Sequence, residues 1–166
     1  MNERARPALR PVPGARADVA FCGYCGVHAA PEAWEPGRSR VCEHCRMGLL
    51  LSAEAGIAPT PTDAFLVVDE VLAVRALSAR AERLLDVPET AAVNRQVSAL
   101  LVPADTSPQA RASLPALIAQ ARVGGPAAGE LQVSVRPPDV FGVRYLARIG
   151  PCRPGPATLV VLAEEL

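Results

Sequence analysis

The sequence predicts an α+β protein in two parts, a small N-terminal metal-binding module followed by a larger domain built on an antiparallel sheet. Four of the five cysteines lie in two Cys-x-x-Cys pairs near the N-terminus. Beyond them the apolar pattern runs from strand-like to helical spacing and back to strand-like alternation. The Pro-rich residues 57–62 separate the two patterns and predict a short, semi-rigid linker.

The chain of 166 residues has room for one ordinary domain and a small module. Residues 1–18 are rich in proline and arginine without an apolar period, so we expect a disordered tail. Residues 19–56 hold the cysteine module, and residues 63–166 form the larger domain. No run approaches the roughly 18 apolar residues of a membrane span, and the first residues lack the apolar core of a secretory signal. We therefore expect a cytoplasmic protein, whose thiols stay reduced.

The net charge of the chain indicates no particular class of partner, because 17 basic residues balance 17 acidic ones. Every basic residue is an arginine, and Ala, Pro, Val and Gly are abundant. This composition is typical of a GC-rich bacterial source.

The cysteine spacing predicts one structural zinc ion per chain. It matches the four-thiolate pattern C-x2-C-x15–20-C-x2-C, in which each turn brings its sulfurs to one ion at about 2.3 Å. The predicted ligands are Cys22, Cys25, Cys42 and Cys45. Four protein ligands leave no open position for water or substrate, so the ion would be structural and its binding would fold the module.

The residues around the cysteines suggest how the module folds. Gly23 and Gly26 permit the positive backbone dihedrals of a tight knuckle. The second pair leads into a predicted short helix over Glu43–Ala55, which Gly56 would end. A knuckle, a hairpin and a helix-borne second pair resemble a treble-clef or zinc-ribbon finger.

Two other thiol chemistries compete with zinc. A thioredoxin-like redox pair is disfavoured because neither pair starts a helix within a strand–helix–strand unit. An iron or iron–sulfur centre also takes four thiolates. His28 and His44 lie in the module, but four cysteines already close the site, so we expect both at the surface or behind the ligands.

The finger's charges favour protein contact or structural support over nucleic acid. A nucleic-acid reader is expected to carry a basic stripe, and here three arginines are offset by three glutamates. They are Arg38, Arg40 and Arg46 against Glu32, Glu35 and Glu43. Trp34 is predicted to be the aromatic core of the finger rather than an interface anchor.

The larger domain opens with a hairpin and helices. Ala64–Val68 and Val71–Ser78 are aliphatic runs separated by Asp69-Glu70, which predicts two strands and a turn. Apolar residues then recur at the helical spacing i, i+3, i+4 in three segments. These residues are Ala81, Leu84 and Leu85, then Val97, Leu100 and Leu101, then Leu114, Leu117, Ile118 and Ala121 in a longer helix that stops at Gly124-Gly125.

Three strands complete the domain. Leu131, Val133 and Val135 alternate with polar residues, which predicts a strand with one solvent-exposed face. Val143–Gly150 and Ala157–Glu165 supply two more strands, joined by the turn-forming segment PCRPGP.

This order of elements, together with the segment FLVVDEVLAVRALSARAERLLDVPE, resembles a PAS domain. Asp69 ends the first strand as in that family, and the helix matches at Ala81, Glu82, Leu84 and Leu85. Ser78 stands where asparagine is usual and Asp86 where glycine is usual. The resemblance covers residues 63–166 and implies a five-stranded antiparallel sheet with helices on one face.

The resemblance implies a sensory or dimerisation module that holds a small ligand or none. Histidine-ligated haem is not expected because both histidines lie in the finger. A photoreceptive flavin is not expected because Asn94-Arg95-Gln96 lacks the reactive cysteine of that class. A small apolar ligand remains open, and Cys152, in the last turn, is predicted to be a spectator thiol.

No catalytic set stands out, and Glu164-Glu165 is interpreted as a solvated tail, so we do not expect an enzyme. We expect a bacterial cytoplasmic signalling or regulatory protein, homodimeric, whose PAS-like domain and structural zinc finger act through protein contacts. The alternatives are a nucleic-acid-binding transcriptional regulator that uses the finger and a thiol redox sensor that releases zinc on oxidation. The sequence identifies neither the signal nor the partner.

Overall fold

A computed structural model describes residues 17–35, 37–105, 113–123 and 131–164, apart from the side chains of Trp34 and Ser113. The cysteine module contains a strand, a 3-10 helix and a second strand: β1 (Asp18–Cys22), η1 (Pro31–Trp34) and β2 (Leu50–Glu54). The larger part contains β3 (Ala64–Asp69), β4 (Val74–Leu77), α1 (Ala79–Leu85), α2 (Glu89–Ala92), η2 (Val97–Ala99), β5 (Val102–Pro103), α4 (Ser113–Arg122), β6 (Leu131–Arg136), β7 (Tyr145–Cys152) and β8 (Ala157–Glu164). The predicted tail, where it covers residues 1–16, and the predicted core role of Trp34 lie outside the described residues.

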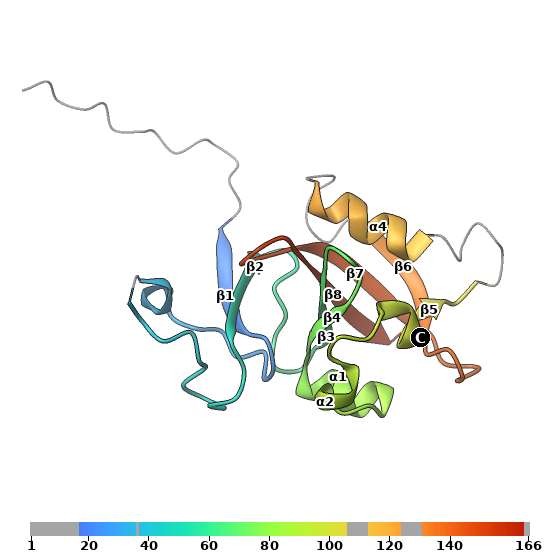
Figure 1. The fold of residues 1–166 in the computed structure, drawn as a ribbon, viewed down its shortest axis with the longest axis horizontal. Helices are drawn as coiled ribbons and strands as arrows, with labels where there is room; N and C mark the ends of the chain where they lie inside the picture. Colours follow the sequence, from blue (N-terminus) through green and yellow to red (C-terminus); the bar gives the residue numbers. More distant parts are fainter. Residues whose placement is uncertain (1–16, 36, 106–112, 124–130, 165–166) are drawn as a thin grey trace, which may run out of the picture.

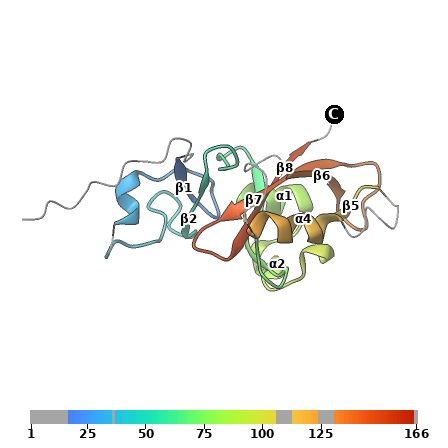
Figure 2. The same ribbon diagram turned by 90° about the horizontal axis from the view of Figure 1, so that it is seen from above.

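The larger part is a curled antiparallel sheet with few helices, which confirms the predicted mixture of α and β structure. Its strand order is β4-β3-β8-β7-β6-β5. Within the described residues the sheet has six strands instead of the predicted five, because the two-residue strand β5 pairs with the end of β6. In Figures 1 and 2 the paired strands β1 and β2 lie between η1 and this sheet.

The main core lies between the helices and one face of the sheet. α1 packs on β3, α2 on β4, and α4 on β6, β7 and β8. The buried side chains of α4 are Leu114, Ile118 and Ala121, on the face that the sequence predicts. On the sheet side, Leu66 and Val68 of β3 point into the same core.

The opposite face of the sheet carries the cysteine module. Phe65 and Val67 alternate with the residues of the main core and join a second cluster with Phe21 and Ile57. The rings of Phe21 and Phe65 meet edge to face with centroids 5.7 Å apart. Burying a phenylalanine contributes on the order of 2–3 kcal/mol, so the module and the sheet stabilise each other.

Backbone bonds extend this junction along β2. The N–H of Ser52 donates to the carbonyl of Arg153 at 2.9 Å, and the N–H of Arg153 donates back to Ser52 at 2.8 Å. The Arg153 guanidinium also pairs with Asp18 at 2.8 Å. The module therefore contacts the turn between β7 and β8 as well as the sheet face.

The prediction of a helix over Glu43–Ala55 is wrong. Leu50–Glu54 forms strand β2, which pairs antiparallel with β1 in the register Asp18↔Glu54 to Cys22↔Leu50. Leu, Ala and Glu favour helix locally, but pairing with β1 satisfies the backbone while Leu50 and Ala53 become buried. Gly56 lies in the turn at residues 55–57 and ends no helix.

Two smaller expectations also change. The segment with Val97, Leu100 and Leu101 buries all three side chains, but forms a 3-10 turn instead of an α-helix. Strand β7 continues through Cys152, which pairs with Ala157, so Cys152 does not lie in the turn.

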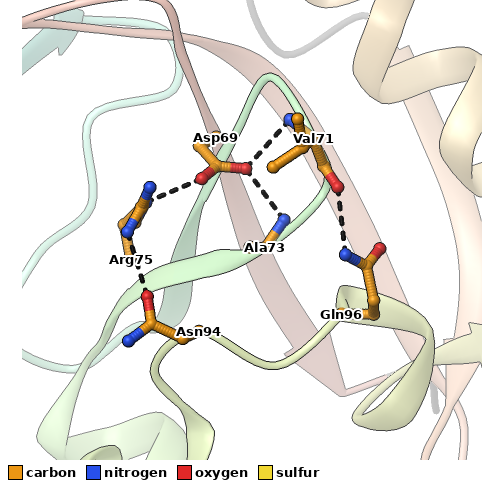
Figure 3. A network of polar contacts seen from close by, with 6 residues as sticks. All are labelled: Asp69, Val71, Ala73, Arg75, Asn94 and Gln96. Carbon is orange, nitrogen blue, oxygen red and sulfur yellow. Dashed lines mark hydrogen bonds and ion pairs between the residues drawn. The ribbon is translucent and has the colours of Figure 1, made fainter.

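A polar network holds the β3–β4 hairpin (Figure 3). The carboxylate of Asp69 accepts hydrogen bonds from the N–H groups of Val71 and Ala73 at 3.0 and 2.9 Å, and pairs with Arg75 at 2.7 Å. Burial acts to raise the pKa of Asp69, but these bonds and the arginine charge outweigh it and lower the pKa. The outer contacts are Arg75 to Asn94 and Gln96 to the carbonyl of Val71. They tie the hairpin to the segment that follows α2.

Candidate metal centre

The structure brings the four predicted cysteines together. Two belong to the first knuckle, at the end of β1, and two belong to the second knuckle, in the turns before β2. All four Sγ atoms lie within 4.8 Å of one another. The cluster consists of Cys22, Cys25, Cys42 and Cys45.

The sulfur spacing fits a tetrahedral metal site. A tetrahedron with sulfurs about 2.3 Å from a central ion has sulfur–sulfur edges of about 3.8 Å. Across the two knuckles, Cys22 Sγ lies 3.6 Å from Cys45 Sγ, and Cys25 Sγ lies 3.8 Å from Cys42 Sγ. A disulfide would need about 2.05 Å. The four sulfurs are therefore positioned to hold a metal ion.

The two knuckles repeat one backbone geometry. The N–H of Gly26 donates to the carbonyl of Cys22 at 3.0 Å, and the N–H of Arg46 donates to the carbonyl of Cys42 at 2.8 Å. Both donor residues have positive φ, 72° at Gly26 and 57° at Arg46. The predicted glycine dihedral thus holds at Gly26, whereas arginine adopts the matching position in the second knuckle.

Gly23 is needed because a side chain there would be crowded, and not because its φ is positive. A Cβ there would lie 3.0 Å from Cδ1 of Leu51. The predicted positive φ at Gly23 is therefore wrong, because its backbone runs close beside β2 in an ordinary conformation.

Backbone N–H groups are directed at the sulfurs. Tyr24 and Cys25 each donate to Cys22 Sγ at 3.4 Å, and Gly48 donates to Cys45 Sγ at 3.4 Å. Such donors stabilise thiolate charge, as a four-thiolate site requires.

Burial acts on the same thiols in the opposite sense. It raises the pKa of Cys22 and of Cys25. At Cys45 burial also acts upward, but hydrogen bonds from the amides of Gly48 and Met47 and from the neighbouring cysteine thiols together outweigh it and lower the pKa to about 7. A cation among the sulfurs would stabilise the thiolate forms that burial disfavours. The donor set and its setting therefore fit a metal ion.

Gly48 is the residue that lets the knuckles close, and the cysteine pattern alone did not single it out. A Cβ at this position would overlap Cys22 Sγ and lie 2.8 Å from Cβ of Tyr24. Its place three residues after Cys45 is the signal that identifies it.

Both histidines lie outside the cluster, as expected of surface residues. His28 is exposed, and its Nε2 lies 2.8 Å from the carbonyl oxygen of Pro59 in the linker. His44 is exposed on the second knuckle. Among the described residues, cysteines alone form the metal-ligating cluster.

The finger's charges are mixed. Arg38 pairs with Glu35 at 3.7 Å, with both side chains more than half exposed. Arg40, Arg46 and Glu43 are also exposed. The surface around the second knuckle therefore carries charge of both signs.

Cys152 is unsuited to thiol chemistry. It lies at the end of β7 with 2% of its surface exposed. Burial raises the pKa of its thiol to about 12, so it stays protonated near neutral pH.

A cavity of about 390 Å³ opens between η2, β5, α4 and β6. Its lining is mainly apolar and includes Leu101, Leu114 and Arg136. The Arg136 guanidinium donates to the carbonyls of Pro137 and Pro138. The cavity borders the helix-covered face of the sheet, for which the sequence leaves both a small apolar ligand and no ligand open.

Within the described residues, no helix combines the length and apolarity needed to cross a membrane. Neither a protein-family model nor a curated protein matches this chain.

Proposed function

We propose that the chain is a bacterial cytoplasmic regulatory protein in which a zinc finger and a PAS-like domain act together through protein contacts. The zinc is structural, since four cysteine thiolates complete a tetrahedron and leave no position for a substrate. The role is regulatory and not catalytic.

Three features of the larger part support its PAS-like character. Five of its strands in the described part of the chain have at least four residues, the helices pack on one face of the sheet, and the β3–β4 hairpin leads directly into α1. The first hairpin is short for the family, and the two residues that depart from the family pattern are accommodated locally. Ser78 caps α1 by accepting from the N–H of Ala81 at 3.1 Å, and Asp86 adopts the left-handed conformation with φ 52°.

The observation that carries the proposed protein contact is an apolar surface on the second knuckle. Val41, Met47 and Leu49 are 42%, 69% and 59% exposed. Val41 and Leu49 form an antiparallel bridge, so their side chains lie on one face. Several exposed apolar side chains within one short segment of a small module are typical of a protein-binding surface.

The same surface makes nucleic acid the weaker candidate. A backbone-binding finger needs unpaired basic residues along a stripe, whereas Arg38 is paired with Glu35 and the second knuckle exposes apolar side chains. A homodimer formed through the knuckle and a small apolar ligand in the cavity beside α4 both remain compatible with the proposal.

The experiment is a pull-down from an extract of the source cells with three baits: the wild-type chain, Leu49→Asp and the control Val123→Asp. Val123 is 82% exposed at the end of α4, outside the finger. We expect specific proteins, or a second copy of the chain, to be retained by the wild type and the control and lost from Leu49→Asp. Retention of the same proteins by all three baits, or capture of nuclease-sensitive material that dissociates steeply with salt, would refute the protein-contact role.

A further inference from the structure

Tyr24, inside the first knuckle, is bonded to the larger part of the chain as well as to the metal centre. Its N–H donates to Cys22 Sγ at 3.4 Å. Its carbonyl accepts from the N–H of Ala79, the first residue of α1, at 2.9 Å. Its hydroxyl donates to Oε2 of Glu82, one turn along α1, at 3.0 Å. One residue thus joins a metal ligand to a helix on the other side of the module boundary.

The contact continues beyond α1 through two glutamates. Glu82 also accepts, at Oε1, from the N–H of Glu89, the first residue of α2, at 2.6 Å. Glu89 in turn accepts from the N–H of Leu77 in β4 at 3.3 Å. The chain of bonds therefore runs from the metal centre to α1, α2 and the edge strand β4.

The bonds at the start of α1 are ones that the helix needs. The first N–H groups of a helix have no partner within it. Here Ser78 satisfies the N–H of Ala81, and the Tyr24 carbonyl satisfies that of Ala79. A knuckle that loses its shape takes one of these acceptors away from α1.

We propose that metal binding at the four-cysteine site is thermodynamically coupled to the stability of α1 and α2 through Tyr24. The inference rests on the proposed zinc centre and adds that the finger reports its metal state to the helices. Because such coupling is reciprocal, loss of the Tyr24–Glu82 contact weakens metal binding by the same factor by which metal loss weakens that contact.

The test uses the full-length wild-type chain, Tyr24→Phe and the control Arg80→Gln, an exposed side chain on the same helix. Tyr24→Phe removes the hydroxyl and keeps the ring and the backbone. Hydrogen exchange is followed in residues 79–92 and in α4, with metal bound and after chelation. Metal affinity is measured by competition with a chelator of known strength.

For the wild type we expect chelation to speed exchange in residues 79–92 more than in α4. Metal-loaded Tyr24→Phe should already exchange faster in residues 79–92 and bind metal about three- to tenfold more weakly, as expected for one half-exposed hydrogen bond to a carboxylate. The control should match the wild type in both measurements.

The coupling is refuted if Tyr24→Phe binds metal like the wild type, or if its exchange in residues 79–92 is unchanged. Equal acceleration in α4 and residues 79–92 after chelation would also refute it, because metal loss would then loosen the whole chain. The metal content of the wild-type chain separates failure of the coupling from failure of the proposed function. A wild-type chain that binds no metal would refute the zinc centre itself. A wild-type chain that binds metal, together with a Tyr24→Phe variant that behaves like it, would refute only the coupling.

Discussion

Gly48→Ala tests whether the second knuckle closes over the first as tightly as the geometry requires. The added Cβ would overlap Cys22 Sγ and lie 2.8 Å from Tyr24 Cβ and 2.9 Å from Tyr24 N. Ordinary contacts between such atoms are about 3.5 Å, so a knuckle must move by about 0.7 Å to clear Tyr24 and by more than that to clear Cys22 Sγ. Metal–ligand distances tolerate about 0.2 Å, and the nearest atoms are a ligand and backbone, which do not swing aside.

Overpacking of this kind costs about 1–3 kcal/mol. If the cost falls on the metal-bound state, metal affinity drops by about 5- to 150-fold. Competition with a chelator measures the drop directly, and thermal unfolding of the loaded chain reports the accompanying loss of stability.

Gly142→Ala is the matched control. Gly142 has φ +83° and no atom within 4 Å of an added Cβ. Alanine there costs about 1–2 kcal/mol of backbone strain without touching the metal centre. Unchanged metal affinity in Gly48→Ala, or an equal change in both variants, would show that the knuckles do not meet at Cys22 as described.

Three further predictions concern the hairpin, the helix cap and the ligands. Asp69→Asn deletes an ion pair whose arginine is 56% exposed, so we expect a loss of about 0.5 kcal/mol at neutral pH. Because the pKa of Asp69 is lowered in the folded chain, this contribution is present above pH about 4 and lost as pH falls through the folded pKa. Urea unfolding at several pH values measures the free energy of unfolding of the variant and the wild type. A difference between them that stayed constant into strong acid would contradict this prediction. Ser78→Ala removes a buried oxygen that accepts from the N–H groups of Phe65 and Ala81, and should cost about 1–3 kcal/mol; a melting temperature like that of the exposed control Ser98→Ala would refute the double acceptor role. Cys42→Ser should release the metal and unfold the finger. A separate fragment of residues 63–166 should stay folded by circular dichroism, but with a lower free energy of unfolding than in the full chain, since Phe65 loses its contact with Phe21. An unfolded fragment would show that the larger part is not an independent folding unit.

The cysteine cluster was predictable from sequence because its information is local. Two Cys-x-x-Cys turns with suitable spacing specify four sulfurs at one point almost regardless of the rest of the chain. The same holds for α1 and α4, where apolar residues at helical spacing identify both the element and its buried face.

The wrong helix over Glu43–Ala55 shows where local information fails. Its composition favours helix, but the outcome depends on a partner strand some thirty residues earlier in the chain, in the register Asp18↔Glu54. Tertiary pairing overrides propensity in such segments.

Docking of the finger on the sheet was also missed, although the sequence holds a signal for it. Ala64–Val68 is apolar at every position instead of alternating, which indicates a strand covered on both faces. Leu66 and Val68 face the helices, whereas Phe65 and Val67 face the finger. Tyr24 and Glu82 could not be paired in advance, because their contact joins two elements whose packing was unknown.

Metal content decides whether the four cysteines form a zinc centre. The full chain, purified without added metal, is analysed by elemental analysis and native mass spectrometry beside Cys42→Ser. We expect about one zinc per wild-type chain, a colourless protein and loss of the metal in the variant. A metal-free wild-type chain with oxidised thiols, a coloured iron centre, or equal metal in both proteins would contradict the structural zinc centre.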